Sequence, residues 1–160
     1  MKYVYGWWFP DKDQEFSNYL SQVDVAFDGR RVYQPQHQIA CLRLTSERKK
    51  RVAIDVGAHV GLWSYILAHE FEKVFSFEPS AEMRECFKRN VIQDNVTLLD
   101  VGLSDSDKKG ALIVQDSNSG ATYVKFDDDG NIQLRKLDNL GISDVDFIKI
   151  DVEGAEYFVI

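Results

Sequence analysis

The segment from Arg51 to Gly61, RVAIDVGAHVG, constrains this chain more than any other part of it. An apolar run leads directly into a glycine turn and then into an amphipathic helix, which is the first half of a βαβ unit. Glu78 ends a second apolar run about 20 residues after the turn, the spacing at which such units meet a bound ribose. The segment therefore predicts a pocket for a ligand that resembles a nucleotide.

The turn does not fit a dinucleotide. In the G-x-G-x-x-G pattern a second glycine lets the backbone approach a pyrophosphate, but counting from Gly57 the two later glycine positions hold His59 and Leu62. The carboxylate of Asp55 would also repel a phosphate in a poorly screened crevice. S-adenosylmethionine fits better, because it carries an ammonium, a sulfonium and a ribose diol but no phosphate. Glu78 would bind the diol.

A structural interpretation of the same residues stays open. Gly57 and Gly61 would then serve only a tight turn and close packing of the helix. Asp55 and Glu78 would be solvated ends of strands. The two interpretations differ in whether the acidic residues face a ligand.

Length and composition predict one domain of a globular, cytoplasmic protein. The 160 residues, 44% of them hydrophobic, suffice for one substantial core. A net charge of -7 disfavours the phosphate backbone of nucleic acid as a partner. No stretch of the sequence reaches the length of a membrane span. The widely spaced Cys41 and Cys86 fit free thiols in a reducing compartment.

Residues 1–46 and 47–160 differ in pattern and predict an N-terminal extension followed by a cofactor-binding domain. The extension is irregular and rich in aromatic residues, which we expect to pin it onto the domain. Short helices are expected around Glu15 to Leu20 and His37 to Leu44. In the second part strands and helices alternate, which indicates parallel α/β architecture. The expected strands cover 52–56, 74–77, 96–101 and 146–151, and the expected helices cover 62–70 and 80–90.

Residues 105–138 break this alternation. Short β-like runs, separated by the turns SNSG and DDDGN, predict an antiparallel insertion. The acidic turn resembles a calcium loop, but aligning its glycine puts Lys125 and Lys136 at ligand positions, so we expect no calcium. The sequence stops at Ile160, soon after the last strand begins to lead into a helix. We expect either a fragment or another cover for that strand.

Three separated motifs, IDVGAHVG, FEP and DFIKIDVEGAE, resemble those of the FkbM family of S-adenosylmethionine-dependent methyltransferases in order and spacing. The resemblance covers residues 51–160. It departs from the family pattern at His59, where the family usually has asparagine, and at the carboxyl end, where the family's sheet continues. The resemblance implies a Rossmann-like α/β fold with a mostly parallel sheet, helices on both faces, the antiparallel insertion, and the C-terminal strands missing.

The resemblance also implies roles for the residues of the motifs. Glu78 would hold the ribose hydroxyls of the cofactor. His59 keeps a polar side chain that can form a hydrogen bond to the cofactor. The residues that would border the methionine part are Asp55, Gly57, Ala58 and Gly61, and those near the adenine are Gly102 and Leu103.

Carboxylates at the end of the last strand suit proton transfer. Methyl transfer to oxygen needs a group that takes the proton of the acceptor hydroxyl, and we expect Asp151 to be this base because it should face the same crevice as Asp55. Glu153 and Glu156 could position the acceptor or a divalent ion, although acidic residues also stabilise a helix N-terminus without any catalytic role. Lys149 would pair with an acid or face the site. Nothing in the pattern demands a metal ion.

We therefore expect an S-adenosylmethionine-dependent methyltransferase that modifies a hydroxyl on a small molecule or glycan. One alternative is an NAD(P)-binding oxidoreductase that uses Glu78 on the ribose. Another is a truncated, non-catalytic remnant or a half-domain that a partner chain completes. In that case the edge of the strand at 146–151 would be exposed, which predicts association into a homo-oligomer through this edge.

Overall fold

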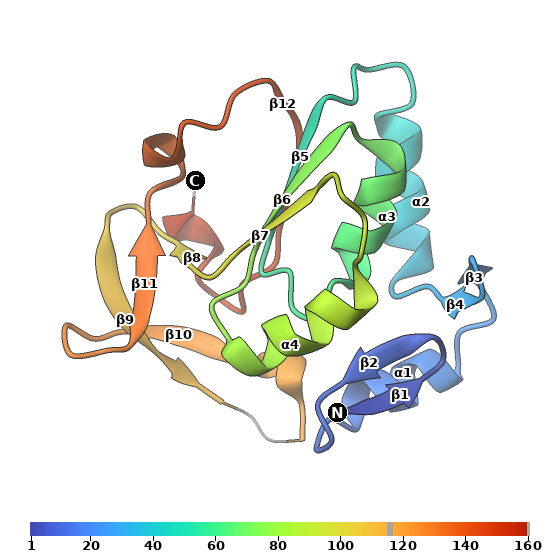
Figure 1. The fold of residues 1–160 in the computed structure, drawn as a ribbon, viewed down its shortest axis with the longest axis horizontal. Helices are drawn as coiled ribbons and strands as arrows, with labels where there is room; N and C mark the ends of the chain where they lie inside the picture. The colour runs from blue at the N-terminus through green and yellow to red at the C-terminus, as the bar shows by residue number, and fades with distance from the viewer. Residues whose placement is uncertain (115–116, 160) are drawn as a thin grey trace.

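A central sheet of four parallel strands organises the fold (Figure 1). The computed structural model describes residues 1–114 and 117–159. Every neighbouring pair of strands runs parallel, so their carboxyl ends meet at one edge of the sheet. This confirms the predicted parallel α/β fold. In spatial order the strands are β12 (Val145–Ile150), β5 (Val52–Val56), β6 (Lys73–Phe77) and β7 (Val96–Leu99).

Two α-helices of the alternating region form where the sequence predicts them. α3 (Leu62–Glu70) follows β5, and α4 (Ala81–Asn90) follows β6. The hydroxyl of Ser80 accepts a hydrogen bond from the backbone N–H of Met83, 3.5 Å away, and so caps α4. Basic residues in the last turn of α4 complement the helix dipole. Local sequence signals therefore set both ends of this helix.

The two faces of the central sheet are covered by different structures. Ala53 of β5 packs in a cluster with Leu67 of α3 on one face. On the opposite face Ile54 packs with residues of the 3-10 helix η2 (Leu137–Leu140). Figure 1 shows α2 (Pro35–Leu44) and α3 on one side of the sheet and the remaining large sheet on the other. The sequence predicts helices on both faces of the sheet. In the structure, α-helices cover one face, and a 3-10 helix together with the strands of the second sheet covers the other.

The chain between β7 and β12 builds a second sheet of four strands. In spatial order these are β10 (Tyr123–Phe126), β9 (Lys108–Ile113), β11 (Ile132–Arg135) and β8 (Gly102–Leu103). The pairs β10–β9 and β9–β11 are antiparallel, as predicted for the insertion, and β11–β8 is parallel. The strand expected at 96–101 ends at Leu99, because the chain then turns into β8 of this second sheet. Gln115, within a predicted β-like run, and Ile160 lie outside the described residues.

The N-terminal segment packs onto α4 and the turn after β5. Asn90 accepts a hydrogen bond from the backbone N–H of Trp8 at 2.7 Å and donates to the carbonyls of Trp8 and Val60 at 2.9 and 2.8 Å. Trp7 is buried in the same hydrophobic cluster as Leu62. Aromatic residues therefore hold this segment on α3 and α4, and the boundary at residue 46 stays a prediction. The segment contains β1 (Lys2–Val4), β2 (Trp7–Phe9), α1 (Glu15–Ser21), β3 (Ala26–Phe27), β4 (Arg30–Arg31) and α2.

The helices in the described part of the chain are short. α2 and α4, with 10 residues each, are the longest among them. After β12, where the sequence predicts the start of a helix, the chain forms the 3-10 helix η3 (Glu156–Phe158). Within residues 1–114 and 117–159, every helix falls short of the length and apolar character needed to cross a membrane.

Gly57 brings the ends of β5 and β12 into direct contact. Its φ of +72° lies in the left-handed region, and a Cβ atom at this position would lie 1.9 Å from the carbonyl oxygen of Asp151. A side chain is excluded both by the backbone conformation and by the space. The turn that begins at Gly57 is therefore fixed against the end of β12.

We predict that Gly57→Ala destabilises the protein more than Gly29→Ala. Gly29 has a similar φ of +75°, but among the described residues nothing lies within 4 Å of where its Cβ would be. Its replacement should therefore cost only the conformational strain of about 1–2 kcal/mol. The steric clash at Gly57 should add a loss of about 2 kcal/mol or more in the free energy of unfolding. Urea unfolding of both variants measures the difference, and equal losses would contradict the close approach of β5 and β12.

Candidate active site

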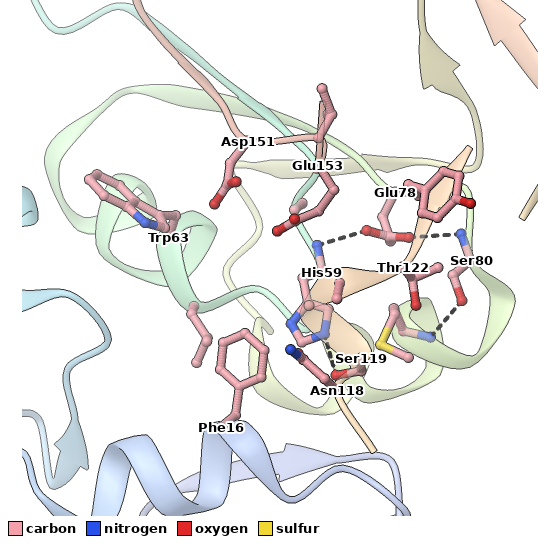
Figure 2. Close-up of a pocket in the computed structure, with 18 of the residues that line it drawn as sticks. Phe16, His59, Trp63, Glu78, Ser80, Asn118, Ser119, Thr122, Asp151 and Glu153 are labelled. Atoms are coloured by element: carbon pink, nitrogen blue, oxygen red, sulfur yellow. Dashed lines mark hydrogen bonds between the residues drawn. The ribbon is translucent and has the colours of Figure 1, made fainter. Parts of the chain in front are cut away.

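A cavity of about 340 Å³ lies at the carboxyl ends of β5, β6 and β12. Its walls come from the N-terminal segment, the turns after β5 and β6, the insertion, and the segment after β12. Figure 2 shows side chains from these parts of the chain around one space. Ligands of parallel α/β folds bind at this edge of the sheet. The lining includes Phe16, Tyr33, His59, Trp63, Glu78, Ser119, Lys149, Asp151 and Glu153.

Glu78 joins the turns after β5 and β6 at the wall of the cavity. One carboxylate oxygen accepts a hydrogen bond from the backbone N–H of His59 at 2.8 Å, and the other accepts one from Ser80 at 2.8 Å (Figure 2). Burial raises the pKa of Glu78, and these two hydrogen bonds oppose the shift. Glu78 is 7% exposed, so its carboxylate is oriented by the backbone and still lines the cavity.

Backbone hydrogen bonds fix the turn after β5. The N–H groups of Gly57 and Ala58 both donate to the carbonyl of Phe77, at 3.1 and 3.0 Å. His59 follows with a left-handed φ of 51°, which is uncommon for a residue with a side chain. The bond from its N–H to Glu78 holds it in this conformation.

Asp55 does not present its charge to the cavity. Its carboxylate is fully buried, lies 3.0 Å from Nζ of Lys149, and accepts a hydrogen bond from the hydroxyl of Ser64 at 2.6 Å. Lys149 also donates to the carbonyl of Gly57 at 2.8 Å. The structure therefore corrects the expectation that Asp55 and Asp151 face the same crevice, because Asp55 is paired with Lys149 behind the cavity wall.

The imidazole of His59 is held between α1 and the insertion. The ring stacks on Phe16 with 4.7 Å between centroids, and its Nε2 lies 2.7 Å from Oγ of Ser119. Burial lowers the pKa of His59 to about 4, against the opposing charge of Asp13 and with a smaller contribution from Lys149. The ring is therefore uncharged at neutral pH.

Asp151 and Glu153 reach the cavity from the end of β12 (Figure 2). Burial raises the pKa of Glu153, and the charges of Asp151 and Glu156 raise it further. Burial, followed by the charge of Asp151, raises the pKa of Tyr33 to about 12. This part of the wall is therefore acidic, and the phenol of Tyr33 stays protonated as a hydrogen-bond donor near the carboxylates.

Glu156 supports the turn that carries these two acids. Its carboxylate accepts hydrogen bonds from the backbone N–H groups of Val152 at 3.1 Å and Gly154 at 3.1 Å. Backbone hydrogen bonds, first of all the one to its own N–H, lower the pKa of Glu156. These hydrogen bonds fit a structural role for Glu156, in which its carboxylate stabilises the backbone around it. Within residues 1–114 and 117–159, no group of three or more His, Cys, Asp or Glu side chains is arranged to hold a metal ion.

The predicted site residues divide between the cavity and other places. Those that line the cavity together are Gly57, Ala58, His59, Glu78, Asp151 and Glu153. Gly61 instead caps α3, where a Cβ would lie 2.5 Å from Val91. Gly102 and Leu103 border a second, smaller cavity of about 40 Å³ beside Leu134. The structure thus places Gly61, Gly102 and Leu103 away from the main cavity wall, and every cofactor role stays a prediction.

Sequence reasoning missed the cavity residues that lie outside the motifs. Phe16 and Tyr33 come from the N-terminal segment, and Ser119 comes from the insertion. Asp13 lies behind Ser119 and is fully buried. The aromatic composition of the N-terminal segment is the one local signal, and it indicates packing as well as binding.

The parallel sheet, the glycine turn and the buried carboxylate at the next strand end define a Rossmann-like α/β protein with a small-molecule site. Residues 55–160 match the model of the methyltransferase FkbM domain family. Because this match covers more than half of the chain, the chain belongs to that family, which confirms the predicted resemblance. A search of curated proteins found no match.

Several solved structures resemble part of the chain. Precorrin-8w decarboxylase of Methanobacterium thermoautotrophicum is 26% identical, with 41% of this chain and 37% of that chain covered and a TM-score of 0.36. The DhpI–SAM–HEP complex is 24% identical, with 53% and 40% covered and a TM-score of 0.36. Phosphoethanolamine N-methyltransferase 1 of Haemonchus contortus, in complex with phosphoethanolamine and S-adenosylhomocysteine, is 19% identical, with 43% and 17% covered and a TM-score of 0.33. The chain thus spans less than half the length of each.

We predict that His59 makes the protein less stable as the pH falls from 6.5 to about 4. The pKa of His59 in the folded protein is about 4, below its ordinary value of 6.5, so the unfolded chain binds more protons in this window. The free energy of unfolding therefore falls as the pH falls, and the loss, on the order of 3 kcal/mol, is complete below the folded-state pKa. Urea unfolding across this range of pH measures it.

The control for this prediction is a second histidine. His59→Gln should lose less stability over the window than the unchanged protein, whereas His37→Gln, at an exposed position, should lose as much. The same pH dependence in both variants would show that His59 is not the responsible group.

Proposed function

We propose that this protein is an S-adenosylmethionine-dependent methyltransferase that methylates a hydroxyl on a small molecule or glycan. The observation that carries the proposal is the carboxylate of Glu78, oriented by the N–H groups of His59 and Ser80 at the wall of a cavity beside the glycine turn. A carboxylate at this place in a Rossmann-like fold suits the two hydroxyls of a ribose. The family to which the chain belongs supports the cofactor.

The cavity fits such a cofactor in size and in chemistry. Its volume of about 340 Å³ lies within the range of about 300–1,000 Å³ that small-molecule sites have. Glu78 would hold the ribose hydroxyls, and the turn at Gly57 and Ala58 would border the methionine part. Asp151 and Glu153 supply negative charge, which suits a cationic ligand. When bound, S-adenosylmethionine supplies a methyl group on a positively charged sulfur.

The charges in the cavity disfavour the nicotinamide alternative. Glu78, Asp151 and Glu153 line the cavity, whereas the charge of Lys149 is offset by Asp55. A pyrophosphate would therefore meet negative charge without a free cation from these residues. This observation supports S-adenosylmethionine, which carries no phosphate. From the sequence we expected Asp55 to repel a phosphate, whereas in the structure the acids that line the cavity would do so.

In this proposal Asp151 acts as the base. Its carboxylate lines the cavity, and its backbone N–H donates to the carbonyl of Val56 at 3.1 Å, which fixes the end of β12. It accepts the proton that the acceptor hydroxyl loses. Glu153 and the phenol of Tyr33 line the same cavity and position the acceptor through hydrogen bonds.

The aromatic part of the lining supports a ring-shaped acceptor with hydroxyl groups. Phe16, Tyr19 and Tyr33 from the N-terminal segment and Trp63 from α3 line the cavity. Such rings pack against the apolar faces of a small molecule or sugar and exclude water from the reacting groups. The neighbouring carboxylates accept hydrogen bonds from hydroxyls. A hydroxylated small molecule or a glycan offers both kinds of surface.

We also propose a cytoplasmic location and association between copies through the edge of β12. Cys41 and Cys86 are free thiols, as is usual in a reducing compartment. β12 is an edge strand of the central sheet, and its Ile148 is 45% exposed. An exposed edge of this kind favours pairing with a second strand.

We predict that Glu78→Gln weakens the binding of S-adenosylhomocysteine by roughly 10- to 100-fold. The amide keeps the size of the side chain but replaces one acceptor oxygen by a donor, so it cannot satisfy both backbone N–H groups and a diol. Isothermal titration calorimetry measures the dissociation constant, and circular dichroism checks the fold of the variant.

Glu82→Gln is the matched control for this measurement. Glu82 is exposed in the first turn of α4, so its replacement should leave the affinity unchanged. An unchanged affinity in a folded Glu78→Gln variant would exclude Glu78 as the ribose ligand. If the unchanged protein binds neither S-adenosylmethionine nor S-adenosylhomocysteine, the proposed function is wrong.

We predict that Asp151→Asn lowers the rate of methyl transfer by roughly 100-fold while the affinity for S-adenosylhomocysteine stays the same. Asparagine cannot take the proton of a hydroxyl. Transfer of tritiated methyl groups to a panel of hydroxylated small molecules and glycans first identifies an acceptor and then measures kcat. Asp94→Asn, at an exposed position, should keep the full rate, and a full rate in Asp151→Asn would rule out this residue as the base.

A further inference from the structure

A buried chain of hydrogen bonds connects the N-terminal segment to the turn after β5. The carboxylate of Asp13, which is 0% exposed, accepts a hydrogen bond from the hydroxyl of Ser119 and another from its backbone N–H at 3.1 Å. The hydroxyl of Ser119 in turn lies 2.7 Å from Nε2 of His59 (Figure 2). Three segments that are distant in the sequence therefore meet at one side of the cavity.

The direction of these hydrogen bonds follows from what each group can donate. An ionised carboxylate only accepts, so the proton of the Ser119 hydroxyl must point to Asp13. The oxygen of Ser119 is then left to accept, and Nε2 of His59 must carry the proton between them. A neutral imidazole has only one N–H. Asp13 therefore dictates the tautomer in which Nε2 is protonated and Nδ1 is not.

His59 links this chain of hydrogen bonds to Glu78, the residue proposed to bind the ribose. Burial lowers the pKa of His59 to about 4, so its ring is neutral and has a defined tautomer at neutral pH. The ring is held on its face by Phe16 and at Nε2 by Ser119. The backbone N–H of the same residue donates to Glu78 at 2.8 Å. A change in the position of the ring would therefore be transmitted to the carboxylate of Glu78.

We propose that Asp13 is a positioning residue of the cofactor site, which acts through Ser119 to hold His59 in one tautomer and orientation and thereby fixes the turn that orients Glu78. The assignment of Glu78 to the cofactor rests on the proposed function. In this proposal the N-terminal segment orients residues of the cofactor site, in addition to forming one wall of the cavity. Asp13 also accepts a hydrogen bond from the backbone N–H of Phe16 at 3.1 Å, so a purely structural role in α1 must be distinguished.

The tautomer can be measured without any ligand. The chain has 3 histidines, so nitrogen-15 NMR of the imidazole rings resolves them, and His59→Gln assigns the signal. In the unchanged protein we expect Nε2 of His59 to be protonated. In Asp13→Ala the acceptor of the Ser119 hydroxyl is removed, so the hydroxyl is released to donate to His59, and the signal should shift toward the tautomer with Nδ1 protonated. Ser119→Ala, which removes only the hydroxyl, should give a mixture of the two.

Calorimetry with S-adenosylhomocysteine measures the effect on the cofactor site. We expect Asp13→Ala and Ser119→Ala to weaken binding roughly 5-fold, and Asp13→Ala to have no further effect when His59 is already replaced by glutamine. Asp24→Ala, at an exposed position in the same segment, is the control and should change neither the tautomer nor the affinity. Circular dichroism checks that each variant is folded.

The outcomes separate positioning from support of α1. An unchanged tautomer in folded Asp13→Ala overturns the proposal, and so does an altered tautomer with unchanged affinity. Weaker binding that is the same with and without His59 would show that Asp13 acts by stabilising α1 alone and would overturn it too. If the unchanged protein binds no S-adenosylhomocysteine, the proposed function and the cofactor role of Asp13 both fail, while the ligand-free NMR still decides whether Asp13 sets the state of His59.

Discussion

The contact between the ends of β5 and β12 is the constraint on which the site depends. Gly57 approaches the carbonyl of Asp151 so closely that no side chain fits between them. Behind this contact Lys149 donates to the carbonyl of Gly57 and pairs with the buried Asp55. Because a buried charge without its partner is costly, the ion pair ties the position of β12 to that of β5. The turn after β5, whose His59 N–H donates to Glu78, and the turn that carries Asp151 are thereby placed relative to each other.

The same ion pair decides which charges a ligand meets. Lys149 lines the cavity, but its ammonium is directed to Asp55 and to backbone carbonyls. Among the described residues, the carboxylates of Glu78, Asp151 and Glu153 accept no hydrogen bond from a Lys or Arg side chain, and Arg84 donates to the backbone carbonyl of Glu78 at 3.0 Å. Their field is stronger in a partly buried crevice than in water. The proposed preference for a positively charged ligand therefore depends on Lys149 being paired with Asp55 rather than with the carboxylates that line the cavity.

The sequence predicts the central sheet and part of the site, but not the walls that other segments supply. β5, α3 and α4 follow the predicted ranges closely because strong apolar patterns and an N-cap define them. Glu78 and Asp151 reach the cavity because residues at the ends of parallel strands share one edge of the sheet. The pairing of Asp55 with Lys149 depends on the direction of side chains inside the sheet, and the bond between Asp13 and Ser119 depends on tertiary folding. Neither leaves a local pattern in the sequence.

The bond between Asp13 and Ser119 also has a consequence for the order in which the protein assembles. It joins residues 106 positions apart, and closing a loop of that length costs on the order of 4 kcal/mol in chain entropy. The contact can therefore persist only after the central sheet and α4 have brought the two segments together. Because Asp13 is fully buried, the bond is shielded from solvent for as long as the N-terminal segment stays packed on the rest of the protein.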